Sequence, residues 1–174
     1  MKSDKLLLLA FLTATASAVY IVESLIMGLL PVPFLRLGLS NIVLLYLVYQ
    51  QRIFSAFIVA ALKSIIGSVA TFSLLTPILP LSLGGGLVAV AVMSLSLLMR
   101  PRFSLFGISV LGALAHNFTQ LILVRYMLIR HDGLFVLTPF LILAALFSGI
   151  VTAYLCIYIE EKIPIFKAAK DEKA

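Results

Sequence analysis

The stretch GALAHNFTQ, residues 112–120, places a histidine, an asparagine and a glutamine inside an otherwise apolar run. An imidazole and two carboxamides can orient a bound molecule through hydrogen bonds, and a histidine can also relay protons. Two charged side chains, Glu23 and Lys63, lie within other apolar runs. A lone intramembrane Asn or His more often bonds a neighbouring helix, but several such groups together favour a common binding site.

The composition is that of an integral membrane protein. Of 174 residues, 63% are hydrophobic and only 11% are charged. A helix needs about 20 apolar residues to cross a hydrocarbon layer roughly 30 Å thick. Six stretches approach that length, approximately 6–29, 37–50, 53–75, 79–99, 103–129 and 134–159. The sequence therefore predicts an all-α protein with six transmembrane helices in one domain, residues 1–160, followed by a short charged cytoplasmic tail, residues 161–174.

The charges in the loops predict the orientation of these helices. With the N-terminus inside, nine basic residues lie on the cytoplasmic side and only Arg36 and Arg130 lie in the outer loops. Six crossings then place both termini in the cytoplasm. The net charge of +6 fits attraction to the inner leaflet of the bilayer. Nucleic-acid binding is not expected, because the basic residues are scattered without interleaved aromatic side chains.

Helical periodicity predicts that the polar groups share faces. At 100° per residue, one stripe of the fifth helix carries small and polar residues, namely Ser109, Gly112, Ala113, His116 and Gln120, with Asn117 at its edge. The third helix groups Ala60, Lys63, Ser64, Gly67 and Thr71 in the same way. Small residues on such faces permit close helix packing or leave room for a ligand.

The outer ends of the helices add further candidates. Asn41 lies close to the outer surface, and Arg36 belongs to the loop GLLPVPFLRLG, residues 28–38, whose prolines restrict its shape. PLSLGGG, residues 80–86, opens the predicted fourth helix. Backbone N–H groups at its glycines could hold an anionic group at the positive end of the helix dipole, although a flexible turn explains GGG equally well.

The first helix carries a stripe of small residues. Ala10, Ala14 and Ala18 recur at four-residue spacing with Ser17 beside them, and such a stripe lets another helix approach closely. That helix could belong to a partner protein or to this chain itself. Glu23 projects on roughly the other side of the first helix.

Three motifs together resemble a known family. ESLIMGLLPVPFLRLGLSN (from Glu23), SLGGG (from Ser82) and FSLFGISVLGALAHNFTQ (from Phe103) are similar to the Gx transporter family, also labelled heptaprenyl diphosphate synthase component I. The resemblance covers most of residues 6–160.

The resemblance implies a prokaryotic cytoplasmic-membrane protein. Its six helices would be arranged as in the substrate-binding S components of energy-coupling factor transporters. There the loop between the first two helices covers an extracytoplasmic cavity, and an alanine stripe contacts a coupling subunit that works with ATPases. Arg36 stands where the resemblance leads us to expect a lysine, and Lys63 where it leads us to expect an arginine. The positive charge is kept at both positions, but the geometry of bidentate anion binding changes.

The two family labels lead to different functions. We expect a noncatalytic uptake subunit, because prenyl transfer needs magnesium held by clustered carboxylates and Glu23 is the only acid in a predicted helix core. The chain carries no P-loop, so ATP would be hydrolysed by other subunits. The alternatives are a noncatalytic subunit associated with isoprenoid-quinone synthesis, a proton-coupled carrier using Glu23 and His116, and a scaffold whose polar groups only join helices.

The predicted site needs no metal or cofactor and binds a small molecule that is anionic or vitamin-like. Arg36 and Lys63 would hold acceptor groups of that ligand, and Glu23 would offset Lys63 or bind a donor. The remaining members would orient the ligand by hydrogen bonds. The predicted set is Glu23, Arg36, Asn41, Lys63, Ser82, Gly84, Gly85, His116, Asn117 and Gln120.

Overall fold

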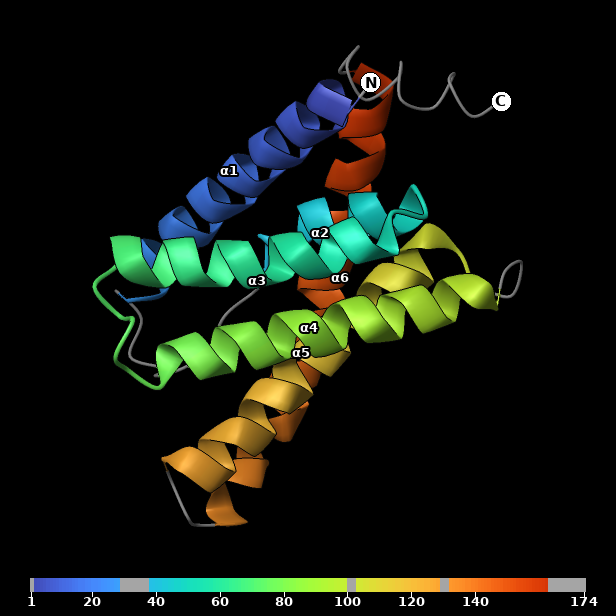
Figure 1. Ribbon diagram of the computed structural model, residues 1–174. Coiled ribbons are helices and arrows are strands. Elements are labelled where there is room, and N and C mark those ends of the chain that lie inside the picture. Colours follow the sequence, from blue (N-terminus) through green and yellow to red (C-terminus); the bar gives the residue numbers. More distant parts are fainter. Residues whose placement is uncertain (1, 29–37, 100–102, 129–131, 163–174) are drawn as a thin grey trace.

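The computed structural model describes residues 2–28, 38–99, 103–128 and 132–162. These residues form helices and contain no strand (Figure 1). The elements are α1 (Lys2–Met27), α2 (Asn41–Tyr49), α3 (Ile53–Ala70), α4 (Ile78–Leu98), α5 (Leu105–Met127), the 3-10 helix η1 (Asp132–Leu137) and α6 (Thr138–Lys162).

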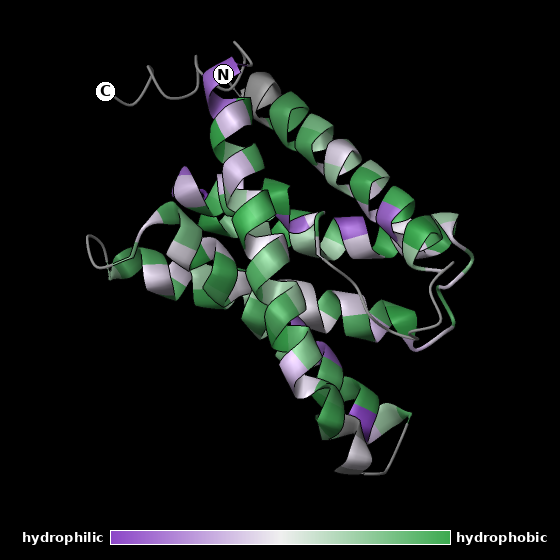
Figure 2. Cartoon of the chain, turned by 180° about the vertical axis from the view of Figure 1, so that it is seen from behind, coloured by the Kyte–Doolittle hydropathy of each residue, from purple (hydrophilic) through white to green (hydrophobic). Residues whose placement is uncertain are grey.

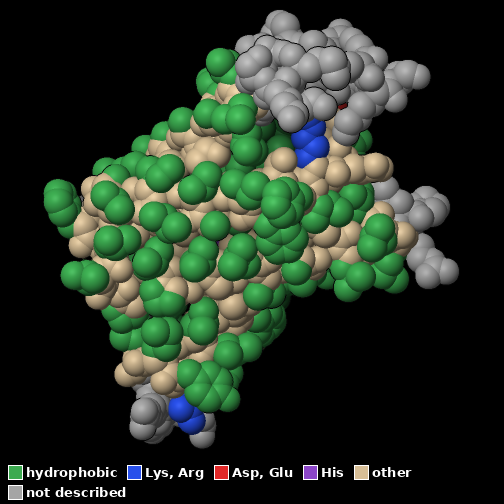
Figure 3. Space-filling model, viewed as in Figure 1, with side chains coloured by type: hydrophobic (Ala, Val, Ile, Leu, Met, Phe, Trp, Pro, Cys, Tyr) green, Lys and Arg blue, Asp and Glu red, His purple; other side chains and the backbone are tan. Residues whose placement is uncertain are grey.

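Five of the helices are long and apolar enough to cross a membrane, and α2 is the exception. Hydrophobic side chains cover the face seen in Figure 3, and Lys and Arg are visible only near its two extremes. An aqueous domain does not expose apolar surface of this extent, whereas hydrocarbon tails solvate it. The membrane-protein prediction is therefore confirmed, with five helices of spanning length among the described residues.

Helix α2 is short and most of its residues are buried. Its nine residues rise about 14 Å, less than half of a hydrocarbon layer of about 30 Å. Its core residues Leu44, Leu45, Leu47 and Val48 are at most 1% exposed. A helix that is apolar all round has no polar face to present, so it is stable only when other helices surround it.

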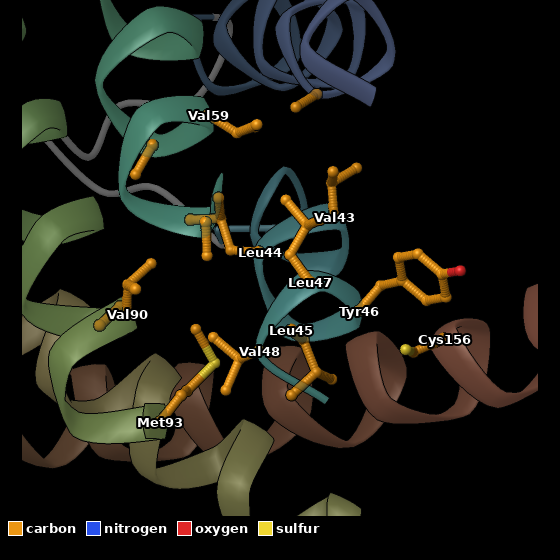
Figure 4. Close-up of a cluster of buried hydrophobic side chains, with 14 of the residues drawn as sticks. Val43, Leu44, Leu45, Tyr46, Leu47, Val48, Val59, Val90, Met93 and Cys156 are labelled. Atoms are coloured by element: carbon orange, nitrogen blue, oxygen red, sulfur yellow. The ribbon is translucent and has the colours of Figure 1, made fainter. Parts of the chain in front are cut away.

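The core forms around α2 (Figure 4). Val59 of α3, Val90 and Met93 of α4, and Cys156 of α6 pack in one cluster with the α2 side chains. Cys156 is a free, buried cysteine that packs here as a small apolar side chain. The central position of α2 fixes where its N-terminal end meets α1 and α3.

Small residues let neighbouring helices approach closely. A methyl group built on Gly67 would overlap the ring of Tyr20, so the Tyr20 ring of α1 rests directly on α3. Between α4 and α5, a methyl group on Gly112 would lie 2.5 Å from Met93. The helices α3 and α4 run side by side in opposite directions, as Figure 1 shows.

The start of α1 and the end of α6 lie at the same end of the structure (Figures 1 and 2). Green colour dominates the helices in Figure 2, and hydrophilic residues are few along their lengths. The hydrophilic residues within the helices are therefore exceptions that need an explanation.

Candidate functional site

A tight turn, Gly38 to Asn41, leads into α2 and forms the centre of the candidate site. The N–H of Asn41 donates to the carbonyl of Gly38 at 2.9 Å. Gly38 has a φ of +74°, in the left-handed region where glycine is unstrained. A methyl group at this position would also lie 2.9 Å from Nδ2 of Asn41. The turn therefore needs glycine both for its backbone conformation and for the close approach of Asn41.

Glu23 of α1 binds the backbone of this turn. Its side chain is only 5% exposed. The N–H of Gly38 donates to Oε1 of Glu23 at 2.5 Å, and the N–H of Ser40 donates to Oε2 at 3.4 Å. The carboxylate thus accepts from one N–H within the turn and from the N–H of Ser40, which directly precedes α2 and has no acceptor within the helix. A negative charge is also favoured there by the helix dipole.

Lys63 of α3 binds the side chains of the same turn. It is 1% exposed, and its Nζ donates to Oγ of Ser40 at 2.9 Å and to Oδ1 of Asn41 at 2.7 Å. Glu23 and Lys63 therefore both bind Ser40, one through its backbone and the other through its hydroxyl. These hydrogen bonds to the turn offset part of the desolvation cost of each buried charge.

His116 of α5 connects this turn to α4. A methyl group on Gly85 would lie 2.8 Å from Cε1 and Nδ1 of His116, and one on Gly38 would lie 3.8 Å from Cδ2. The imidazole therefore lies between the two glycines. Gln120, one turn further along α5, lies beside it with its Cγ 3.3 Å from the same Gly85 position.

Gln120 adds an unsatisfied donor to this group. It is 5% exposed, and its Nε2 has no hydrogen-bond partner among the described residues. A buried amide without a partner costs roughly 1–3 kcal/mol, so a ligand that accepts from it would gain affinity.

The structure thus brings together groups from four helices and the turn. The members in this cluster, hereafter the polar cluster, are Glu23, Ser40, Asn41, Lys63, His116 and Gln120, with Gly38 and Gly85 as its close contacts. Ser82 lies on the neighbouring α3–α4 contact, where its hydroxyl is 3.1 Å from that of Ser64. Arg36, which the sequence predicts for the same site, falls outside the described residues.

Asn117 points elsewhere. Its Nδ2 donates to the carbonyl of Leu141 at 3.2 Å, so it joins α5 to α6. Ser109 makes a similar contact, donating to the carbonyl of Gly149 at 2.7 Å. These two polar groups therefore act as helix contacts, whereas His116 and Gln120 belong to the polar cluster.

The glycines of α4 do not form the start of a helix, as the sequence had suggested. The helix begins at Ile78, and only its first four N–H groups lack intrahelical acceptors. Gly84 and Gly85 lie beyond that turn, so their N–H groups are not available to an anion as expected. They allow close packing instead, because a methyl group on Gly84 would lie 2.8 Å from Leu123 of α5.

The alanine stripe of α1 is open to the surroundings. Ala10, Ala14 and Ala18 are exposed and line a groove of about 590 Å³ between α1 and α3. Ser17 also lines it, is 3% exposed, and its hydroxyl has no hydrogen-bond partner among the described residues. Helices of this chain that the structure describes do not cover the stripe, which leaves it accessible to another protein.

Two features were not apparent from the sequence. Ser40 binds both charged residues, but a serine before an apolar helix is too common to be singled out. Glu160 is buried because α6 continues to Lys162, whereas the predicted helix ends at residue 159. Both follow from contacts between helices, which the spacing of residues along one helix cannot indicate.

The fold and the cluster define a class of protein: an all-helical membrane protein with a buried group of hydrogen-bonding and charged side chains at one end of a short central helix. A sequence model of the heptaprenyl diphosphate synthase component I family matches residues 12–159. The chain therefore belongs to that family. No curated protein and no solved structure matches the chain.

Proposed function

We propose that this protein is the substrate-binding membrane subunit of a small-molecule uptake system, with a site that opens to the outside. In this proposal both termini lie in the cytoplasm and the α1–α2 connection lies on the outer side, with the short α2 leading the chain back towards the cytoplasmic side. The N-terminal end of α1 and the C-terminal end of α6 lie on the same side of the structure, which supports this arrangement (Figure 1). The basic residues then follow the positive-inside pattern of a cytoplasmic membrane.

The observation that carries the proposal is the convergence on one turn. Glu23, Lys63 and His116 come from three different helices, and all of them meet the Gly38–Asn41 turn. Buried charges within a membrane protein are costly and usually serve a function. A scaffold could join the same helices with neutral groups, as Asn117 joins α5 to α6. A ligand that replaces the turn as the hydrogen-bonding partner of Glu23 and Lys63 would explain why these residues are charged.

The arrangement indicates what that ligand offers. Lys63 binds two oxygen acceptors of the turn, so a carboxylate, phosphate or carbonyl oxygen can replace them. Glu23 accepts two N–H groups, so the ligand or the displaced turn must supply donors to it. Gln120 and His116 then orient the bound molecule. In this proposal the loop of residues 28–38 is the gate to the site. Arg36, which belongs to this loop, supplies a further positive charge.

The alanine stripe is the proposed docking face for a transmembrane coupling subunit. Ala10, Ala14 and Ala18 are exposed in a groove, and such a surface lets a partner helix come close. The coupling subunit would bring ATPase subunits, because the chain contains no P-loop. Ala14→Leu is expected to abolish copurification with these subunits while ligand binding persists. Loss of ligand binding together with docking would count against a separate docking face.

Uptake measurements test the proposal. In a purified and folded protein, Lys63→Met and His116→Ala should lower ligand affinity or uptake at least tenfold, because each removes a direct contact. The control is Asn117→Leu, which changes a polar residue of the same helix that contacts α6 instead. If Lys63→Met and His116→Ala leave uptake unchanged, or if they lower thermal stability without any ligand-dependent effect, the scaffold function is correct.

A proton-coupled carrier is the second candidate, and it is favoured because a buried carboxylate and an imidazole approach the same glycine. Glu23 and His116 both approach Gly38, one by a hydrogen bond and one by contact. Uptake that depends strictly on the proton gradient, without copurifying ATPases, would favour it. The family description names a component of heptaprenyl diphosphate synthase, so a role beside an isoprenoid synthase is the third candidate. We propose a noncatalytic chain in all three functions.

A further inference from the structure

The groove beside the alanine stripe contains a polar group that lacks a partner. Ser17 lines this groove and is 3% exposed, and its hydroxyl has no hydrogen-bond partner among the described residues. The other described serine and threonine hydroxyls of α1 are satisfied within the helix. Thr13, Thr15 and Ser24 each donate to the carbonyl four residues earlier, at 2.8, 2.9 and 2.8 Å. Ser17 is therefore the exception among the described hydroxyls of its helix.

The depth of Ser17 in the membrane restricts what can satisfy it. Ser17 lies at the middle of the apolar span Leu6–Met27. The middle of a hydrocarbon layer holds no water, and acyl chains offer no hydrogen bond. A lipid chain in the groove therefore leaves the hydroxyl unsatisfied, whereas a polypeptide can supply the missing partner.

The shape of the groove fits a helix. The helices α1 and α3 meet where the ring of Tyr20 packs on Gly67, and they separate from there towards the N-terminal end of α1 (Figure 1). The alanine stripe forms the α1 wall of the space between them, and Leu62 and Ile66 form its α3 wall. Small residues on one wall let the backbone of an inserted transmembrane helix approach closely.

On the basis of the docking face in the proposed function, we propose that Ser17 donates a hydrogen bond to a carboxamide side chain on the partner helix that fills this groove. The described residues that line the groove are uncharged, so a neutral acceptor suits it better than a carboxylate, which would be buried without a counterion. The hydroxyl lies deep in the groove, so a side chain reaches it more readily than a backbone carbonyl does. Ser17 thereby selects the partner, because a helix with an apolar side chain at this depth leaves the hydroxyl unsatisfied.

Two synthetic transmembrane helices provide the probe. Each is an Ala/Leu host helix of about 20 residues with alanines at four-residue spacing and a dansyl label, and it carries either Asn or Leu at its centre. The chain has no tryptophan, so Phe11→Trp, on the side of α1 that faces α2 and α6, serves as the energy-transfer donor in lipid vesicles. The Asn helix should bind about threefold to tenfold more tightly than the Leu helix, the usual effect of one hydrogen bond between transmembrane helices.

Variants of the full-length Phe11→Trp protein locate the effect. Ser17→Ala should bind both helices with the affinity of the Leu helix. Thr13→Val is the matched control one turn away in the same groove, and it should keep the difference, because the Thr13 hydroxyl is already bonded to Leu9. Ala14→Leu should prevent binding of both helices. The proposal is overturned if the two helices bind equally, if neither binds, if Ser17→Ala keeps the preference or if Ala14→Leu still binds.

Thermal unfolding of the isolated chain in detergent micelles gives an independent check. Ser17→Ala removes a buried group that lacks a partner, so the midpoint temperature should rise by about 2–4 °C, whereas Thr13→Val should not raise it. An unchanged or lower midpoint for Ser17→Ala would mean that the hydroxyl is already bonded within the chain, and would overturn the proposal. No other subunit enters these measurements. The role of Ser17 can therefore fail while a coupling subunit still copurifies, and failed copurification leaves these results unchanged.

Discussion

Removal of the Lys63 ammonium should destabilise the protein more than removal of any exposed charge. In Lys63→Met, the hydroxyl of Ser40 and the amide oxygen of Asn41 lose donors at 2.9 and 2.7 Å in a buried site. Leaving a buried acceptor without its partner costs about 1–3 kcal/mol, and more where the lost partner is charged, so two such losses cost about 3–5 kcal/mol. We expect a loss of that size in the free energy of unfolding.

The assay is reversible unfolding in mixed detergent micelles, followed by circular dichroism. Lys162→Met is the control, because this lysine is exposed at the end of α6 and its loss should change the free energy of unfolding by no more than about 0.5 kcal/mol. Glu23→Gln combined with Lys63→Met should cost about 2 kcal/mol less than the sum of the single changes, because the two residues share Ser40. Additive effects, or equal effects of Lys63→Met and Lys162→Met, would refute the proposed coupling.

The other predictions concern close contacts and the two faces of α5. Gly85→Ala should lower the free energy of unfolding by about 1–3 kcal/mol, since the methyl group would lie 2.8 Å from His116. Gly86→Ala is the control, because its methyl group would meet nothing nearer than 3.7 Å, and it should be neutral or stabilising by up to about 1 kcal/mol. The unfolding assay described above compares the two variants. Equal losses of stability would contradict the close contact between Gly85 and His116. Asn117→Leu should lower the free energy of unfolding by about 1 kcal/mol, because it removes the hydrogen bond to the carbonyl of Leu141. Ligand affinity, measured by titration, should not change. A tenfold weaker affinity would place Asn117 in the binding site.

Periodicity predicted the faces of the long helices well. Lys63, Ser64 and Gly67 form one buried face of α3, as their spacing indicates. The same reasoning grouped His116 with Gln120 on α5 and left Asn117 at the edge, where it contacts α6. These predictions succeed because one face of each helix is covered by protein while the other is left for lipid.

Periodicity could not predict the features that depend on other helices. Helix α2 is apolar all round, so its pattern does not reveal where it begins or how deeply it is buried. The glycines of α4 looked like a helix start, but their purpose is the close approach of α5, which only the packed structure displays. Glu160 lies just beyond the predicted end of the sixth helix at residue 159, and its burial became apparent only because α6 continues to Lys162.

Mass spectrometry of small molecules released from gently purified protein tests the central claim most directly. Our account predicts that the wild-type chain and Asn117→Leu retain the same compound. It predicts that Lys63→Met and His116→Ala, compared at equal amounts of folded protein, lose it. Equal retention by all four proteins would contradict the account, because the compound would then bind away from the polar cluster; no retained compound in any of them would contradict it as well.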